Sequence, residues 1–594
     1  MEIYLAGKRI SLNPRRTIGV GGEATIYPFQ GTAVKIYHPE ILAERPRLGE
    51  KLKAFPSSPP AKLIGPLALV EDKNGQIVGF TMQELKDTES LFMLTDKKFR
   101  ENFPPERLKT IFLDILATLK KIHNARIVVG DLNNLNLLFK DNDVFFIDAD
   151  SMQYGGFPCS VATEKFLDPE LYRIDLSKRP VFTTSHDFYA FTTILFESLL
   201  LVHPYGGVHK KYPNLVRRAE NRISVFNAEV KYPKAGLPLK ILPDELLGYF
   251  SRVFDQGKRE IFPVPLLENL RWTKCGACGE IHARPICPYC ITAAPAAIKE
   301  VTQVNRKCVA TSVFKTSGRI ICAKTENGRL KLVYEEKGAV KREDGTTVIT
   351  YAPDNQTRFD IMGDTTLVGK NSRLIIVKTG KVLAETSTST LGNLPMFAAN
   401  QSDYFRLQGD QLIRGENKIL GEVVGKQTWF KAGERFGFGF YRIGAKTIHF
   451  LFDAARSGIN DSLALPKIEG QLLDADCFFS TDHALFLTST MVSGKQQNSM
   501  HLISRMGDLV ASKTEEAQNS RVLSAIHNKA LGGNKIITAT DEGLVLLTPE
   551  NRDLKEVTIF TDTEPFVDEQ TEVLPAPEGI YTVTGKEVKL LKLI

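Results

Sequence analysis

The fold of the first half of the chain is decided by two stretches, Val128-Val-Gly-Asp-Leu-Asn-Asn-Leu-Asn-Leu-Leu-Phe139 and Val144-Phe-Phe-Ile-Asp-Ala-Asp-Ser151. Each places an aspartate beside an apolar run, and Asn136 follows Asp131 by five residues. Phosphoryl transfer needs a carboxylate that orients the attacking hydroxyl, and it needs oxygen ligands for Mg²⁺. Asp131 suits the first role, and Asn136 and Asp148 suit the second. The two stretches therefore predict a phosphoryl-transfer site.

A glycine cluster near the start of the chain predicts a place for phosphates. Residues 18–27 read Ile-Gly-Val-Gly-Gly-Glu-Ala-Thr-Ile-Tyr, and glycines let backbone amides approach phosphate oxygens closely. Hairpin turns also use glycine, so the cluster alone is a weak signal. Lys35 strengthens it, because a lysine among the apolar residues of 33–36 needs an anionic partner such as a nucleotide phosphate.

Further motifs match a known family in order and spacing. Residues 1–272 resemble a protein kinase domain. More narrowly, they resemble the bacterial kinases encoded beside von Willebrand factor A proteins and protein phosphatase 2C-type enzymes in tellurite-resistance-type gene clusters. The narrower resemblance is carried by Gly130-Asp-Leu-Asn133, Phe146-Ile-Asp-Ala-Asp-Ser151, Cys159-Ser-Val-Ala-Thr163, Leu167-Asp-Pro-Glu170, His186-Asp-Phe-Tyr-Ala-Phe191 and His203-Pro-Tyr-Gly-Gly207.

The resemblance implies a fold and an activity. The fold is an α+β bilobal kinase-like domain. The activity is that of a Ser/Thr protein kinase, which uses ATP and Mg²⁺ to phosphorylate a protein substrate. The same resemblance implies a von Willebrand A-type protein and a protein phosphatase 2C-type enzyme as partners.

The resemblance also implies a nucleotide site in the first hundred residues. Its expected members are Gly19, Gly21 and Gly22 over the phosphates, Lys35 on the α- and β-phosphates, and Met82, Glu84 and Leu85 at the adenine. The kinase pattern pairs this lysine with a glutamate on the following helix. Glu50 fits that position best, and Glu44 is the second choice.

The resemblance places the reaction centre in the two opening stretches and the segment that follows them. Its expected members are Asp131 as the catalytic base, Thr163 beside it, and Asn136 and Asp148 as Mg²⁺ ligands. Residues 162–170 align with the Ser/Thr kinase pattern, which favours a Ser/Thr hydroxyl over tyrosine. Asp187 is expected to brace the catalytic loop, and Arg259 is expected to pair with Glu170.

Several positions depart from the kinase pattern. Val129 and Gly130 replace the His and Arg of the His-Arg-Asp motif, Asn133 replaces a lysine, and residues 149–150 replace Phe-Gly. Loss of that arginine removes the usual control by activation-loop phosphorylation. Two alternatives stay open: a nucleotide-binding pseudokinase scaffold, and a small-molecule kinase on the same fold, which the short segment from Asp148 to Glu170 does not exclude.

Four of the eight cysteines form two Cys-x-x-Cys pairs. Cys275 and Cys278 are followed, after eight residues, by Cys287 and Cys290. Four closely spaced thiolates suit structural Zn²⁺, whereas a redox Cys-x-x-Cys needs no second copy. The sequence predicts a zinc ribbon at 273–292, followed by a linker at 293–303.

Residues 304–594 contain short β segments separated by Gly, Asn and Asp turns, and a weak repeat of 33 to 55 residues. This pattern predicts an all-β propeller of six or seven blades, which would bind partners or regulate the kinase. Two β-sandwiches are the alternative.

Composition sets further limits. Hydrophobic residues make up 43% and charged residues 24% of the 594, which is typical of globular domains. A net charge of +7 is too small to indicate a nucleic-acid partner. We find no apolar run long enough for a membrane span and no secretory signal, so we expect a cytoplasmic protein.

Overall fold

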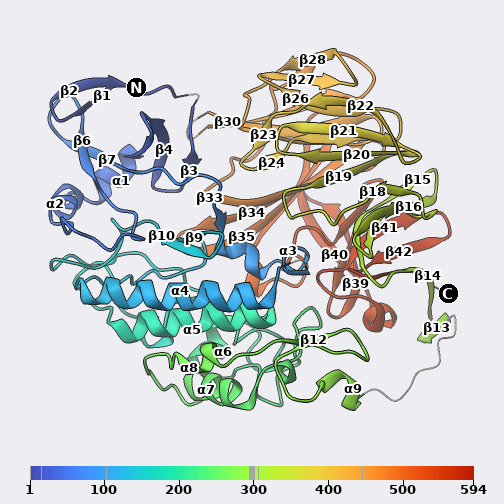
Figure 1. Cartoon of the computed structure of the whole chain (residues 1–594). Helices are drawn as coiled ribbons and strands as arrows, with labels where there is room; N and C mark the ends of the chain where they lie inside the picture. The colour runs from blue at the N-terminus through green and yellow to red at the C-terminus, as the bar shows by residue number, and fades with distance from the viewer. Residues whose placement is uncertain are drawn as a thin grey trace. The chain divides into compact units, whose positions relative to one another are not determined.

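The computed structural model of the chain divides into two compact units (Figure 1). The first unit comprises Met1–Ala297 with Met491–Lys495, and the second comprises Ile298–Thr490 with Gln496–Ile594. The structure describes residues 2–14, 16–101, 103–292, 302–305, 307–443 and 446–593. The linker expected at 293–303 lies mostly outside these residues.

The first unit begins with a seven-stranded sheet in the order β2-β1-β6-β7-β5-β4-β3. Its strands are β1 (Glu2–Leu5), β2 (Lys8–Ser11), β3 (Gly19–Val20), β4 (Ala24–Phe29), β5 (Thr32–Tyr37), β6 (Ala68–Glu71) and β7 (Ile77–Gln83). Strand β5 pairs with β4 on one side and β7 on the other. Because β5 is internal and apolar, its single lysine, Lys35, is buried with its neighbours.

Two long helices form the core of the rest of the first unit. Helix α4 (Pro105–Asn124) buries residues three and four positions apart, as an amphipathic helix does. Helix α5 (Thr184–Leu200) is apolar on nearly all sides and is buried from Asp187 onward. Phe112 of α4 and Phe191 of α5 pack edge to face, with ring centroids 5.8 Å apart. The other α-helices are α1 (Pro39–Glu44), α2 (Leu48–Lys53), α3 (Lys97–Glu101), α6 (Leu215–Glu220), α7 (Asp244–Phe254), α8 (Pro265–Glu268) and α9 (Pro288–Thr292).

A three-stranded sheet brings the two opening stretches of sequence together. Its strands are β8 (Glu89–Ser90), β9 (Leu137–Lys140) and β10 (Asp143–Phe146), in the order β10-β9-β8. The hairpin register sets Leu137 opposite Phe146, and Ile147 N donates to Asn136 O at 3.0 Å. The residue before β9 and the residue after β10 are therefore neighbours. A further pair of strands, β11 (Thr273–Lys274) and β12 (Ile281–His282), lies close to the cysteines in sequence.

The described part of the second unit contains short strands and two 3₁₀ turns, and no α-helix. Its sheets are β13-β14-β43-β42-β41, β15-β16-β17-β18, β19-β20-β21-β22, β25-β26-β27-β28, β29-β30-β31-β32, the pair β23-β24, and an eight-stranded sheet β33-β34-β35-β36-β40-β39-β38-β37.

The strands of these sheets are β13 (Thr302–Asn305), β14 (Cys308–Lys315), β15 (Arg319–Glu326), β16 (Arg329–Glu336), β17 (Ala339–Arg342), β18 (Thr347–Ile349), β19 (Arg358–Met362), β20 (Thr365–Lys370), β21 (Arg373–Lys378), β22 (Lys381–Ser387), β23 (Thr390–Leu391), β24 (Leu394–Pro395), β25 (Phe397–Ala399), β26 (Tyr404–Gln408), β27 (Gln411–Arg414), β28 (Lys418–Glu422), β29 (Thr428–Ala432), β30 (Phe436–Ile443), β31 (Lys446–Asp453), β32 (Ile459–Asn460), β33 (Gln471–Phe479), β34 (His483–Val492), β35 (Lys495–Ser504), β36 (Leu509–Glu516), β37 (Lys529–Gly532), β38 (Lys535–Thr540), β39 (Gly543–Glu550), β40 (Asp553–Phe560), β41 (Glu572–Ala576), β42 (Gly579–Val583) and β43 (Glu587–Leu593).

Edge strands of these sheets contact one another in a closed ring. Strand β15 contacts β19, and the contacts continue through β25, β29, β33 and β37 to β41, which contacts β15. The eight-stranded sheet consists of two halves joined at one parallel pairing, and its end strands β33 and β37 contact each other, so it nearly closes on itself. Strand β14 pairs with β43 near the end of the chain, with Cys308 opposite Leu593. This ring differs from the alternative of two β-sandwiches, in which two sheets pack face to face.

No helix among the described residues is both long and apolar enough to cross a membrane.

Candidate functional site

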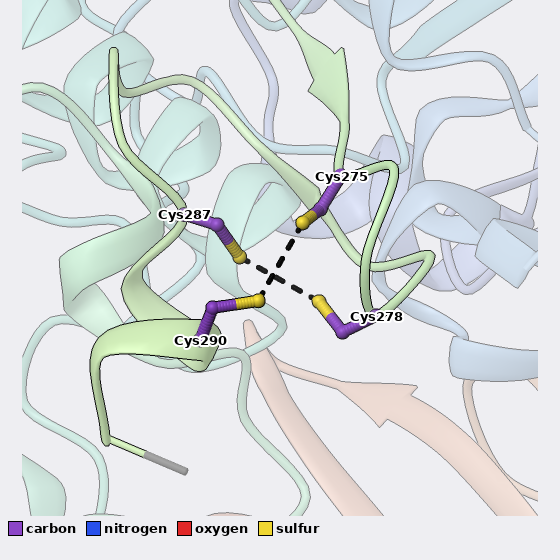
Figure 2. Close-up of side chains that lie close together, drawn as sticks. All are labelled: Cys275, Cys278, Cys287 and Cys290. Carbon is purple, nitrogen blue, oxygen red and sulfur yellow. Dashed lines mark hydrogen bonds between the residues drawn. The ribbon is translucent and has the colours of Figure 1, made fainter.

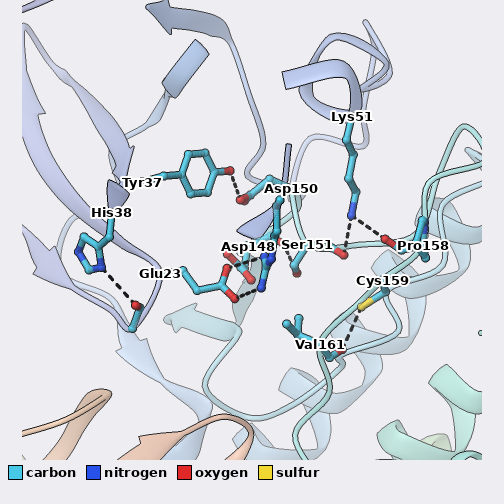
Figure 3. A network of polar contacts seen from close by, with 12 residues as sticks. Glu23, Tyr37, His38, Lys51, Asp148, Asp150, Ser151, Pro158, Cys159 and Val161 are labelled. Carbon is cyan, nitrogen blue, oxygen red and sulfur yellow. Dashed lines mark hydrogen bonds and ion pairs between the residues drawn. The ribbon is translucent and has the colours of Figure 1, made fainter. Parts of the chain in front are cut away.

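The site is organised around the ammonium group of Lys35. Its Nζ atom lies 2.5 Å from Asp148 Oδ1 and 2.7 Å from Asp150 Oδ2. Tyr37, two residues further along β5, donates its hydroxyl hydrogen to Asp150 (Figure 3). We call Lys35, Tyr37, Asp148 and Asp150 the Lys35 cluster. Lys35 and Asp150 are only 7% and 4% exposed, so these charges are stabilised mainly by each other.

The two carboxylates change the acid–base properties of the cluster. Burial alone would lower the pKa of Lys35, but the charges of Asp148 and Asp150 outweigh burial and raise it. Burial would raise the pKa of Asp148, yet the charge of Lys35 lowers it. Burial, together with the charge of Asp150, raises the pKa of Tyr37. The cluster therefore has one cation against two carboxylates.

Asp131 lies in a loop that is held by hydrogen bonds to its carboxylate and to its main-chain oxygen. Thr163 N donates to Asp131 Oδ1 at 2.7 Å, and the amide of Asn133 donates to Thr163 Oγ1 at 3.0 Å. The amide of Asn136 donates to the main-chain oxygen of Asp131 at 3.3 Å. Burial raises the pKa of Asp131. The structure thus brings Asp131, Thr163 and Asn136 together, as expected.

Gly130 is required by the geometry of the same loop. Its φ is +74°, and a Cβ atom there would lie 2.8 Å from Cys159 Cβ. The Arg of the kinase pattern does not fit this backbone. Asp187 accepts hydrogen bonds from Val129 N and Gly130 N, both at 2.8 Å, and from His123 Nε2 at 2.8 Å. Asp187 therefore braces the loop, as predicted.

The expected pairing of Lys35 with Glu50 is not the pairing in the structure. The Glu50 side chain is 62% exposed and binds Arg47 at 3.0 Å, and Glu44 is not an ion-pair partner of Lys35 either. Helix α2 buries Leu48, Lys51 and Leu52, which lie three and four residues apart. Glu50 therefore faces away from the sheet.

Lys51 takes the place on α2 where a glutamate was expected. Its ammonium group donates to Ser151 O and to Pro158 O, both at 2.9 Å (Figure 3). Burial lowers the pKa of Lys51. The helix thus holds the loop after Asp148 through main-chain oxygens.

The expected partner of Arg259 is also different. Arg259 donates two hydrogen bonds to the carboxylate of Asp168, one of them 2.7 Å long. The side chain of Asp168 is fully buried. The prediction named Glu170, which lies two residues further on. Asp168 Oδ1 also accepts from Glu170 N, so it begins the short turn that contains Glu170.

The glycine cluster and the proposed adenine segment lie on the sheet. Gly19 is in β3, and Gly21 N donates to Ala24 O at 2.9 Å. A Cβ atom at Gly19 would meet nothing within 4 Å, so neighbouring protein atoms do not require glycine there. Met82 is near the end of β7, opposite Ala33 of β5, and Glu84 and Leu85 follow the strand.

A segment distant in sequence also belongs to the first unit. The segment is Met491–Lys495. Glu164 N donates a hydrogen bond to Gly494 O at 2.9 Å, and Lys495 Nζ lies 3.4 Å from Glu164 Oε2. A Cβ atom at Gly494 would lie 2.1 Å from Ala162 O. The segment therefore lies against the residues that hold Asp131.

The four cysteines form a compact thiol cluster (Figure 2). The sulfurs of Cys275 and Cys290 are 3.6 Å apart, as are those of Cys278 and Cys287, and all four lie within 4.8 Å of one another. A disulfide would need about 2.05 Å. Four sulfurs at about 2.3 Å from a tetrahedral Zn²⁺ lie about 3.8 Å apart, so the cluster is compatible with zinc. Backbone hydrogen bonds from Cys278 and Ala277 lower the pKa of Cys275.

No protein-family model matches the chain, and a search of curated proteins finds no match.

Three features of the site were missed by sequence reasoning. Asp150 was named within the family motif of residues 146–151 and as a departure from Phe-Gly, but was given no role of its own, although it follows Asp148 by two residues at the same strand end. Lys51 could have been found from the helical spacing of Leu48, Lys51 and Leu52. No local signal in the sequence connects 491–495 with Glu164.

Proposed function

We propose that the first unit transfers the γ-phosphoryl group of ATP to a Ser/Thr hydroxyl of a partner protein. The observation that carries this proposal is the convergence of Lys35, Asp131, Asn136 and Asp148, which come from three separate parts of the sequence. Lysine, a base carboxylate and two oxygen ligands are the groups that this reaction needs.

The residues present fit ATP and Mg²⁺. Asp148 offers a carboxylate and Asn136 an amide oxygen, and both are hard oxygen ligands of the kind that Mg²⁺ prefers. The NH₂ group of the Asn136 amide donates a hydrogen bond to the main-chain oxygen of Asp131. When bound, Mg²⁺ would neutralise the charge that develops on the phosphates. Lys35 would bind the α- and β-phosphates, and Met82, Glu84 and Leu85 would face the adenine through main-chain groups.

Asp131 is suited to the role of base. The hydrogen bond from Thr163 N fixes one carboxylate oxygen, and a substrate hydroxyl can donate to the other. Asn133 stands where the kinase pattern has a cationic lysine. Its amide donates a hydrogen bond to Thr163 Oγ1. The site therefore has one positive charge fewer for the transferred phosphate, and we expect slow turnover.

Transfer of label from γ-³²P-ATP in the presence of Mg²⁺ tests the proposal. The full chain should label itself or a partner protein, and Asp131→Asn should not. Asp87→Asn is a matched control, because Asp87 is an exposed aspartate. ATP binding without transfer would favour the pseudokinase scaffold. Transfer to small metabolites alone would favour the small-molecule kinase.

We further propose that Cys275, Cys278, Cys287 and Cys290 hold a structural zinc ion, and that residues 273–292 are a zinc ribbon. All four positions of a tetrahedron are supplied by thiolates, so no position is left for a substrate. The role of such a site is to fold a short segment that buries little apolar surface.

We infer that the second unit is a seven-bladed propeller. The closed ring of edge strands supports seven blades, and the pairing of β14 with β43 closes the ring between early and late strands. Its role would be to bind partners or to regulate the first unit. A chain that ends before residue 304 also lacks Met491–Lys495 of the first unit; it should keep ATP binding but differ from the full chain in partners or in rate.

A further inference from the structure

Asp150 is a buried carboxylate whose oxygens are taken by two groups. Lys35 Nζ lies 2.9 Å from Oδ1 and 2.7 Å from Oδ2, and the Tyr37 hydroxyl donates to Oδ2. A buried carboxylate needs such partners, because it loses its hydration on burial. Asp150 is therefore committed to Lys35 and is poorly placed to bind a metal ion.

Asp148 differs from Asp150 in its surroundings. Its side chain is 28% exposed, and its backbone φ is +62°. Lys35 binds Asp148 at Oδ1. A cation at Asp148 would compete with Lys35 for this carboxylate. Asp150 would then be the carboxylate that keeps Lys35 in place.

Helix α2 contributes no anion to this arrangement. Glu50 is exposed and paired with Arg47, and the helix sends Lys51 to main-chain oxygens instead. Helix α2 therefore holds the loop that contains Ser151 and Pro158, and it does not bind Lys35.

We propose that Asp150 is the positioning residue of Lys35. Its carboxylate holds the ammonium group in place for the nucleotide phosphates, which is the role expected of Glu50. Lys35 and the proposed metal ligand Asp148 are then both held by one short loop, residues 148–151. A displacement of α2 reaches this loop through Lys51. The consequence for catalysis rests on the proposed function, whereas the ion pair itself does not.

A double-mutant cycle on the full chain tests the ion pair without ATP or metal. Lys35→Met and Asp150→Asn should each lower the melting temperature of the first unit, because each leaves a buried charge without its partner. The double variant should lose less than the sum of the two shifts. The matched cycle of Lys35→Met with Glu50→Gln should be additive. Additive shifts for Asp150, or equal coupling for Glu50, would overturn the proposal.

Kinetics test the positioning role. Asp150→Asn should lower kcat by about a hundredfold. Without the Asp150 carboxylate the ammonium group of Lys35 is no longer held in place, so it stabilises the transition state less well. The KM for ATP should change by less than about threefold, and Glu50→Gln should leave both constants within about twofold. Equal losses in the two variants would contradict the proposal. If the unaltered chain transfers no phosphate, the proposed function fails, and the melting cycle still decides the role of Asp150.

Discussion

The Lys35 cluster of the first unit and a charge cluster of the second unit differ in how their charges balance. In the second unit, Asp476 binds Lys431 through one oxygen and His527 Nδ1 through the other, and His527 Nε2 lies 2.7 Å from Asp474. Burial would lower the pKa of His527, but its hydrogen bonds to Asp474 and Asp476 raise it to about 10. We call these four residues the His527 cluster. It has two cations and two carboxylates at neutral pH.

The difference in charge indicates different roles. The His527 cluster is neutral, so its members satisfy one another and join β29 and β33 to the residues before β37. The Lys35 cluster has one ammonium group for two carboxylates, and the charge of Arg45, which pairs with Glu23, also lowers the pKa of Asp148. Under the proposed function the Lys35 cluster binds a further cation, whereas the His527 cluster serves stability.

The largest expected effect separates the two clusters by activity. Asp148→Asn removes the proposed metal ligand and should reduce phosphotransfer at least about a thousandfold. Lys431→Met breaks the other cluster and should leave the rate within about twofold. The measurement is initial-rate transfer from Mg²⁺-ATP. Comparable losses in both variants would show that the comparison of charges is not a guide to function.

The cysteine cluster is a third case, because its sulfurs bind zinc only as thiolates. Four thiolates without a counter-ion would repel one another, so their ionisation should accompany binding of a cation. Metal analysis should find about one Zn²⁺ per chain, and Cys275→Ser with Cys290→Ser should release it. Cys322→Ser is the control, since Cys322 lies outside the cluster. A folded, metal-free protein would refute the zinc assignment.

The pH dependence of stability should have opposite signs for different histidines of the second unit. Burial lowers the pKa of His449 and of His501 to about 4, so the unfolded chain binds protons before the folded one does. Their contribution is present above pH 6.5 and is lost as pH falls toward 4, by on the order of 3 kcal/mol for one histidine; the two losses are not additive, because the charge of His501 also lowers the pKa of His449. His449→Phe should flatten this acid limb, measured by urea unfolding between pH 4 and 7.

His527 is the matched case with the opposite sign. Its folded pKa is raised, so its contribution is complete below pH 6.5 and is lost as pH rises toward about 10. His527→Gln should flatten the alkaline limb and leave the limb between pH 4 and 7 unchanged. If both variants altered the same limb, the charge assignment of the His527 cluster would be wrong.

The smallest expected effect concerns the contact that supports Asp131. Gly494 has φ +76° and no room for a Cβ atom, so Gly494→Ala should weaken the contact with Glu164 N by about 1 kcal/mol. Hydrogen exchange of the Glu164 amide should become faster. Gly533→Ala is the control, because Gly533 has φ +63° but free space around it. Equal exchange rates of the Glu164 amide in both variants would show that Gly494 does not support the site.

Much of the candidate site could be predicted from local sequence. Asp131, Asn136 and Asp148 lie beside apolar strands, and a hairpin of only a few residues brings their segments together. The cysteine pairs are separated by eight residues, so their convergence needs one turn. The short strands of residues 304–594 were predicted for the same reason, because alternation and turn residues act over a few positions.

The partners of the buried charges were decided by tertiary structure. Lys35 binds Asp150 and not Glu50, because burial of Leu48 and Leu52 orients the six-residue helix α2 and turns Glu50 to solvent. A pairing over 115 residues has no periodic signal in the sequence. The sequence by itself determined which residues are candidates for the proposed chemistry, since residue type and spacing are local. Only the tertiary structure decided which of them hold one another, since ion pairs depend on side-chain direction and burial.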